Sequence, residues 1–154
     1  MKVTFKEIGL HNYEECATLK VGDEQAEFIS PNWESLLEVH YEVEGDRYPL
    51  AIYDGGKMIG FLMYVFYPAD EDYPLDSWWV ERFMIDKAYQ GRGYGKASLK
   101  SFFSYFKSKF GDIELRIATD SANNPAIRLY EHMGFVKTGE IAAGEEVLHI
   151  SLED

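Results

Sequence analysis

The sequence predicts an α/β fold in which helices cover both faces of a central twisted mixed sheet of about seven strands. Three observations predict this class. Runs rich in β-branched and aromatic residues alternate with amphipathic helical patterns, a glycine-rich turn joins a strand directly to a helix, and two pairs of strands have the spacing of hairpins. The chain has 154 residues, so we expect 1–154 to form one domain that is large enough to bury a core.

The first half of the chain is predicted to begin with an edge strand and two helices, of which Pro31 opens the second. Two long strands follow, and the turn Asp54-Gly55-Gly56 between them predicts a hairpin. The expected ranges are a strand at 3–8, helices at 12–20 and 31–42, and strands at 48–53 and 57–67. One face of the second helix is expected to carry Trp33, Leu36, Leu37 and Tyr41.

The second half is predicted to contain two strand–helix units and a closing hairpin. A strand at 78–85 leads through the glycine-rich turn into a helix that ends at Gly111. A strand at 113–119 precedes the next helix, for which Asn124 is the expected N-cap ahead of Pro125. The hairpin is expected at 135–141 and 147–152. Core residues are expected to be Leu99, Phe102, Phe103, Phe106 and Phe110 on the first helix, and Ala126, Leu129, Tyr130 and Met133 on the second.

The segment from Glu81 to Lys96 carries the strongest functional signal. Its glycines, Gly91, Gly93 and Gly95, let the backbone approach a ligand closely, and free amides at the start of the following helix favour an anion. The spacing does not fit a dinucleotide fingerprint, whose third glycine would come one residue later, nor a Walker loop, which needs Ser or Thr after Gly-Lys. Taken alone, the segment would also suit an ordinary strand-to-helix turn.

Two motifs together match a known pattern. Gln90-x-x-Gly93-x-Gly95 resembles the Q/R-x-x-G-x-G/A loop of the GNAT superfamily of N-acetyltransferases, and residues 123–135 resemble its N-x-x-A-x-x-x-Y-x-x-x-G-F segment. The resemblance covers essentially the whole chain and implies the GNAT fold with acetyl-CoA as co-substrate. The coenzyme contacts that it implies fall on Phe83, Met84, Ile85, Gln90, Gly91, Arg92, Gly93, Tyr94, Gly95, Lys96, Asn123 and Ala126.

Within that superfamily, residues 79–86, 67–72 and 126–130 are similar to spermine/spermidine N-acetyltransferases, which carry a carboxylate where Glu81 stands. The resemblance is looser over 23–76, where substrate choice lies, so the amine stays open. Candidate partners for a polyamine, through ammonium–carboxylate or cation–π contacts, are Asp23, Glu24, Glu71, Asp72, Trp78 and Glu81.

Acetyl transfer to an amine needs a proton acceptor, because polyamine nitrogens are protonated at neutral pH. Glu81 is the best-placed carboxylate, and strand alternation puts it on the face of Phe83 and Ile85. The alternative is that Glu81 only binds the ammonium. Tyr130 is expected to protonate the leaving thiolate, although a core role alone would also explain it. With no Cys or Ser placed to carry the acetyl group, we expect direct attack in a ternary complex.

Two other functions stay open. One is N-acetylation of a different cationic amine, such as an aminoglycoside or a peptide N-terminus. The other is a non-catalytic coenzyme A-binding regulator, against which the presence of both Glu81 and Tyr130 argues.

Charge and composition restrict the partners. The net charge of −12, from 27 acids and 15 bases, disfavours nucleic acid. Between Lys87 and Lys100 there are four bases and no acid, a patch suited to a polyanionic coenzyme. No signal segment, membrane-spanning run or metal-ligand spacing is visible, and the lone Cys16 forms no internal disulfide, so we expect a cytoplasmic protein in which Cys16 is buried. The resemblance is compatible with a homodimer.

Overall fold

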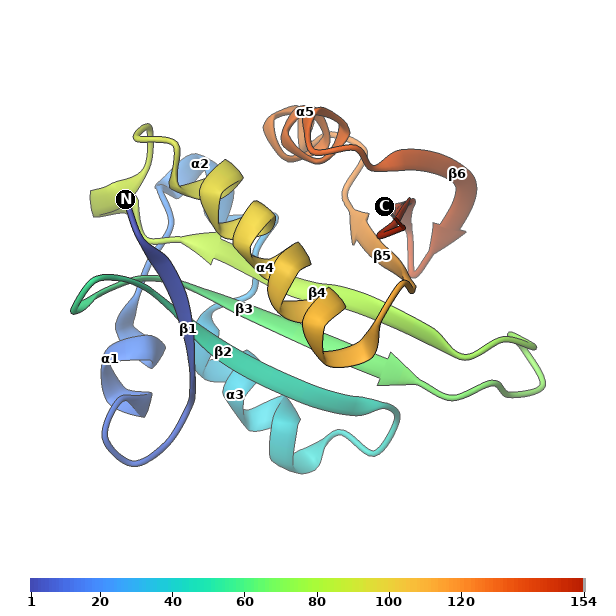
Figure 1. Cartoon of the computed structure of the whole chain (residues 1–154), viewed down its shortest axis with the longest axis horizontal. Helices are drawn as coiled ribbons and strands as arrows, with labels where there is room; N and C mark the ends of the chain where they lie inside the picture. Colours follow the sequence, from blue (N-terminus) through green and yellow to red (C-terminus); the bar gives the residue numbers. More distant parts are fainter. Residues whose placement is uncertain (154) are drawn as a thin grey trace.

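The computed structural model describes residues 1–153, in which seven strands form one mixed sheet in the order β1-β2-β3-β4-β5-β7-β6 (Figure 1). Neighbouring strands are antiparallel except β4 and β5, which are parallel. The elements are β1 (Val3–Glu7), α1 (Tyr13–Thr18), α2 (Asp23–Ala26), α3 (Asn32–Tyr41), β2 (Asp46–Asp54), β3 (Lys57–Tyr67), β4 (Ser77–Ile85), the 3-10 turn η1 (Lys87–Tyr89), α4 (Tyr94–Phe110), β5 (Glu114–Thr119), α5 (Asn124–His132), β6 (Val136–Ala142) and β7 (Glu145–Ser151).

Helices cover both faces of the sheet, as the sequence predicts. Helix α4 crosses one face, while α1 and α3 lie on the other (Figure 1). The core under α4 is aromatic, and Phe102 and Phe106 are fully buried there against Tyr64. The core under α1 and α3 is smaller and includes Cys16, which is 0% exposed as expected, and Met84.

The predicted strands and long helices are confirmed, with two local differences. The N-cap of α5 is Asn123, whose side chain accepts from the Ala126 amide, so Asn124 is the first helical residue rather than the cap. The sequence analysis also missed α2, which is too short to show a helical period. Within residues 1–153, no helix is long and apolar enough to span a membrane.

The four apolar residues of α3 that were expected to share one face differ in burial. Leu36 packs against the smaller core, whereas Trp33, Leu37 and Tyr41 are 55%, 49% and 79% exposed. A polar contact also anchors the helix, since the buried Asn32 side chain donates to the Cys16 carbonyl at 2.9 Å.

Candidate active site

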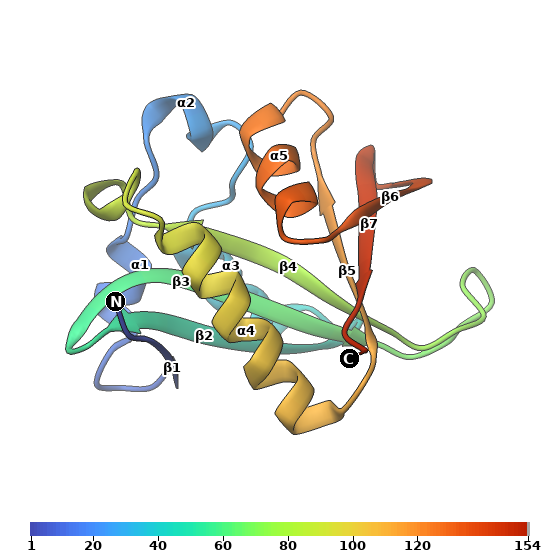
Figure 2. The ribbon, with the colours of Figure 1, turned by 45° about the horizontal axis from the view of Figure 1, so that its top comes forward.

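Strands β4 and β5 pair along only part of their length. Their ladder joins residues 78–80 to residues 115–117 and then ends. Beyond it, residues 81–85 and 118–119 diverge, and Figure 2 shows α2 and α5 beside the open end. The divergence leaves a cavity of about 460 Å³. Backbone groups that face the gap have no strand partner there, so they are free to bind a ligand.

The glycine-rich turn between β4 and α4 forms one wall of this cavity. Gly91 and Gly93 have φ of 76° and 87°, which other residues adopt only with strain. Gly93 is the N-cap of α4, and the first helical bond runs from the Ala97 amide to the Gly93 carbonyl. The amides of residues 94–96 precede that bond, so they have no acceptor within the helix and lie at the positive end of its dipole. The turn is therefore suited to a phosphate.

Most residues predicted to contact the coenzyme lie along the cavity. The lining members of that set are Phe83, Met84, Ile85, Gln90, Gly91, Gly93, Tyr94, Gly95, Asn123 and Ala126. Arg92 and Lys96 are not among the lining residues and are exposed instead, with the Arg92 guanidinium 5.7 Å from the centre of the Tyr89 ring. Coenzyme contact by any of these residues stays a prediction.

Gln90 has a structural contact that its motif did not indicate. Its side-chain amide donates to the Ile85 carbonyl and to Oε1 of Gln25, both at 2.8 Å. Gln25 belongs to α2, and it lines the cavity together with Phe28 and Ile29. Gln90 therefore ties the α2 segment to the glycine-rich turn.

Helix α5 supplies another wall of the cavity, which includes Tyr130. Tyr130 is 8% exposed, lies edge-on to Phe135 with ring centroids 5.9 Å apart, and lines the cavity. Burial raises the pKa of the Tyr130 hydroxyl, and the charge of Glu145 adds to that rise. The hydroxyl is therefore protonated at neutral pH, as an acid must be. From the sequence, Tyr130 could be a core residue or a proton donor. In the structure its ring packs against the core and also lines the cavity, so both roles are possible.

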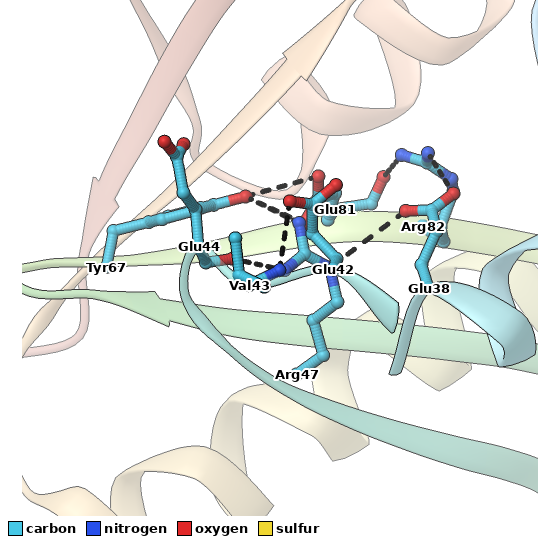
Figure 3. Close-up of polar contacts among 8 residues, drawn as sticks. All are labelled: Glu38, Glu42, Val43, Glu44, Arg47, Tyr67, Glu81 and Arg82. Carbon is cyan, nitrogen blue, oxygen red and sulfur yellow. Dashed lines mark hydrogen bonds and ion pairs between the residues drawn. The ribbon is translucent and has the colours of Figure 1, made fainter. Parts of the chain in front are cut away.

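Glu81 is the extra residue of a β-bulge in β4. On β3, Tyr64 lies opposite Val80 and Met63 lies opposite Arg82, so Glu81 has no partner. A bulge shifts the alternation of side chains by one residue. The side chains of Glu81 and Arg82 consequently both point away from α4 and toward α3 (Figure 3).

This bulge makes one prediction wrong. Strict alternation places Glu81 on the face of Phe83 and Ile85, and those two residues do pack into the core under α4. The Glu81 carboxylate instead contacts Tyr67 and Arg47 on the opposite face (Figure 3). Period-two reasoning cannot foresee an inserted residue.

Glu81 belongs to a network of charged groups on the α3 face (Figure 3). The Tyr67 hydroxyl donates to the Glu81 carboxylate at 3.1 Å, and Nη2 of Arg47 lies 3.5 Å from it. Arg47 also approaches Glu38 at 3.9 Å, while Arg82 donates to Glu38 at 3.3 Å. Each carboxylate therefore faces a guanidinium.

Electrostatics at this network leave Tyr67 neutral and Arg47 desolvated. Burial, reinforced by the charge of Glu81, raises the pKa of Tyr67 to about 12. The Arg47 side chain is only 6% exposed, so its charge depends on the surrounding carboxylates. The ion pairs themselves are balanced, with Arg47 and Arg82 against Glu38 and Glu81, and the exposed side chains of Glu42 and Glu44 beside them make this surface net acidic (Figure 3).

The other predicted substrate residues lie away from the cavity. Asp23 and Glu24 occupy the first turn of α2, and Glu71 and Asp72 lie in the exposed loop between β3 and β4. Their contacts with an amine stay a prediction, one that the cavity lining does not support. The Trp78 ring is partly buried against the aromatic core, 4.2 Å from the ring centre of Phe110, and does not line the cavity, so its contact with an amine also stays a prediction.

The sequence analysis did not identify Arg47 or Glu145 as site residues. Arg47 lies one residue before the strand predicted at 48–53 and within the observed β2, and only strand pairing brings it near Glu81. Glu145 follows the turn between β6 and β7 and lines the cavity with Tyr130. An acid directly after Ala-Gly in a predicted hairpin was the available signal, but turn acids are common and solvated.

The described residues contain one cysteine, Cys16, which lies in the smaller core. Burial raises the pKa of the Cys16 thiol to about 12, and its side chain is enclosed, so it is a poor nucleophile. In residues 1–153, no group of three or more His, Cys, Asp or Glu residues is arranged to hold a metal ion.

Known sequences match this chain over most of its length. The model of the acetyltransferase (GNAT) family matches residues 11–135. The chain is 32% identical to the probable spermine N(1)-acetyltransferase of Bacillus subtilis subsp. natto (strain BEST195), over 96% of this chain and 97% of that protein.

Solved structures agree with the fold. The aminoglycoside N(6')acetyltransferase from Legionella pneumophila superposes with a TM-score of 0.74 at 18% identity, covering 97% of this chain and 92% of that one. The spermidine N-acetyltransferase from Vibrio cholerae, in complex with CoA and spermine, gives a TM-score of 0.68 at 15% identity, with 97% and 95% covered. At these identities the likeness establishes the fold, and the predicted fold class is confirmed.

Proposed function

The chain belongs to the acetyltransferase (GNAT) family, and on that premise we propose that it transfers the acetyl group of acetyl-CoA to a primary amine of a polyamine such as spermine or spermidine. The enzyme class is that of an acetyl-CoA-dependent N-acetyltransferase. The observation that carries the polyamine assignment is the net acidic network around Glu81, on the rim of the cavity between β4 and β5.

The residues present fit acetyl-CoA. Phosphates would meet the free amides of residues 94–96 and the basic side chains of Arg92 and Lys96. The pantetheine arm would follow the unpaired edge of β4 at residues 83–85, which points the thioester toward the end of the cavity that holds Tyr130. The coenzyme supplies an activated acetyl group there.

The amine would enter from the α3 face, where Glu81 lies. A cation is favoured on this side because carboxylates outnumber guanidinium groups, and a long flexible amine can reach several of them. The nitrogen attacks the thioester carbonyl directly, and the Tyr130 hydroxyl protonates the departing thiolate. Glu81 acts through charge, since the Tyr67 hydroxyl donates to its carboxylate and the Arg47 guanidinium balances that charge.

Turnover of an amine panel tests this proposal. Purified protein with saturating acetyl-CoA would be assayed on spermine, spermidine, a short diamine, an aminoglycoside and a peptide with a free N-terminus. We expect the highest kcat/KM for spermine or spermidine, with the short diamine weaker because it reaches fewer carboxylates. A preference for the aminoglycoside or peptide would instead assign the chain to another cationic amine.

A further inference from the structure

Glu145 is a second carboxylate in the cavity, and it comes from β7 whereas Glu81 comes from β4. It lines the cavity together with Tyr130 and Thr119, at the end where β4 and β5 diverge. Its side chain is partly buried. Neither the family motifs nor the Glu81 network assigns it a role.

The fold holds Glu145 in a defined position. Ala142 pairs with Glu145 across a turn of only Ala143 and Gly144, both with positive φ, at 50° and 80°. The next residue, Glu146, pairs with Thr119 of β5 and places its carboxylate 3.6 Å from Lys137. Because side chains alternate along β7, Glu145 points the other way, into the cavity.

Glu145 also differs from Glu81 in its contacts. In the part of the chain that the structure describes, its carboxylate has no hydrogen bond or ion pair, whereas Glu81 accepts from Tyr67 and faces Arg47. The charged and titratable groups that act on Glu145 are Arg82 and Glu81 of β4, Asp120 after β5 and Tyr130 of α5. Its oxygens are therefore free to accept a proton from a bound ammonium.

We propose that Glu145, rather than Glu81, is the carboxylate that accepts the proton of the attacking amine, an inference that rests on the proposed acetyl transfer. The ammonium carries three protons, of which the amide product keeps one. Glu145 takes one and returns it to solvent. The nitrogen then forms its bond to the carbonyl carbon as the C–S bond breaks, and its second surplus proton replaces the one that Tyr130 gives to the thiolate.

The chemistry of the site agrees with this role. Burial, with the charges of Asp120 and Glu81, raises the pKa of Glu145 despite the opposing effect of Arg82. A proton acceptor with a pKa closer to neutrality is a stronger base while still ionised. The charge of Glu145 also contributes to the raised pKa of Tyr130. The proposed proton donor, Tyr130, and the proposed proton acceptor, Glu145, therefore border the same part of the cavity.

Steady-state kinetics of Glu145→Gln test the proposal, with Glu146→Gln as the matched control on the same strand. We expect kcat on spermidine to fall about 10²-fold in Glu145→Gln, with the KM for acetyl-CoA unchanged. The acid limb of the pH profile of kcat/KM should also flatten. Glu146→Gln should keep both kcat and profile.

A fluorinated amine separates proton acceptance from other roles. Two fluorine atoms on the carbon β to the terminal nitrogen of a polyamine bring the pKa of that ammonium close to neutrality, so that much of the nitrogen is neutral at the assay pH while its shape changes little. The deficit of Glu145→Gln should shrink to less than about 10-fold on this substrate, since no proton needs to be accepted before attack. An equal deficit on both amines, or unchanged activity and pH profile, would overturn the inference.

The design also covers a folding defect and a failure of the proposed function. If the Gln variant loses stability, the ratio of its rates on the two amines is still informative, because both rates come from the same folded molecules. The second variant, Glu145→Asp, should keep the acid limb of the pH profile at a reduced kcat. Failure of the proposed function would show in the wild-type protein as no acetylated polyamine. Glu145 would then be tested on whichever amine the wild type does acetylate.

Discussion

Nη2 of Arg47 lies 3.5 Å from the Glu81 carboxylate, although the two residues belong to strands that are separated by β3. The Arg47 side chain is 6% exposed, so its guanidinium is poorly solvated, and the carboxylates of Glu81 and Glu38 balance its charge. This contact fixes Glu81 at the bulge and compensates its charge. Glu81 is therefore part of an electrostatic network, whereas the Glu145 carboxylate has no such partner among the described residues.

Replacing Arg47 by Met should destabilise the fold, because Glu38 and Glu81 would keep their charges without the cation between them. Since both carboxylates retain some solvent, we expect a loss of about 2 kcal/mol in the free energy of unfolding, below that of a fully buried pair. Urea denaturation measures it. The exposed Arg128→Met serves as control and should change stability by less than about 0.5 kcal/mol. Equal stability of the two variants would mean that Arg47 is not held by its carboxylates.

Replacing Gly93 by Ala should weaken coenzyme binding. The φ of 87° forces strain on an L-residue, and relaxing it would rotate the first amides of α4 away from a phosphate. We expect the KM for acetyl-CoA to rise about 10-fold, equivalent to about 1.4 kcal/mol, with a smaller change in kcat. Gly56→Ala is the control, because its φ is not positive and a Cβ there meets nothing within 4 Å. An unchanged KM would place the phosphates away from this turn.

Replacing Tyr130 by Phe should slow the chemical step while leaving the fold intact. The ring would still pack against Phe135, but the thiolate would lose its proton donor. We expect kcat to fall about 10²-fold with little change in either KM. Tyr48→Phe, on a partly exposed ring outside the cavity, should have no effect. If Tyr130→Phe keeps the wild-type kcat, the residue is only part of the core.

Stability should fall at acid pH partly through Glu114. Burial alone would raise the pKa of Glu114, but hydrogen bonds from His149 and from Arg116 at 2.7 Å outweigh it and lower the pKa below 4.5. A folded pKa below the unfolded one stabilises the fold above the unfolded pKa, and the contribution is lost as pH falls through the folded pKa. Glu114→Gln should therefore be less stable than wild type by about 0.5 kcal/mol at neutral pH and no less stable in acid. Free energies of unfolding of the wild type and of Glu114→Gln, measured from neutral to acid pH, test whether the difference between them disappears.

Local patterns in the sequence predicted the parts of the site that one segment builds. The turn at 91–95 and the start of α5 could be identified because glycine spacing and an Asn-Pro pair have direct backbone consequences. The N-cap of α5 is one residue earlier than predicted, because Asn123 and Asn124 can both cap a helix and the sequence alone does not distinguish them.

Contacts between distant strands could not be predicted in this way. Arg47 meets Glu81 through sheet order, and the bulge at Glu81 inverts the face that alternation assigns. Glu145 enters the cavity because β7 inserts between β5 and β6, a topology that no local pattern encodes. The packing of the Trp78 ring against Phe110 of α4 is likewise a contact between distant segments that no local pattern shows.

Initial rates with spermine and acetyl-CoA varied together distinguish direct acetyl transfer from transfer through an acetylated enzyme. Direct transfer to the polyamine should give measurable turnover and double-reciprocal lines that intersect, as a ternary complex requires, with no acetylated protein when the amine is omitted. Parallel lines together with an acetylated enzyme, or no turnover of spermine at saturating acetyl-CoA, would contradict it.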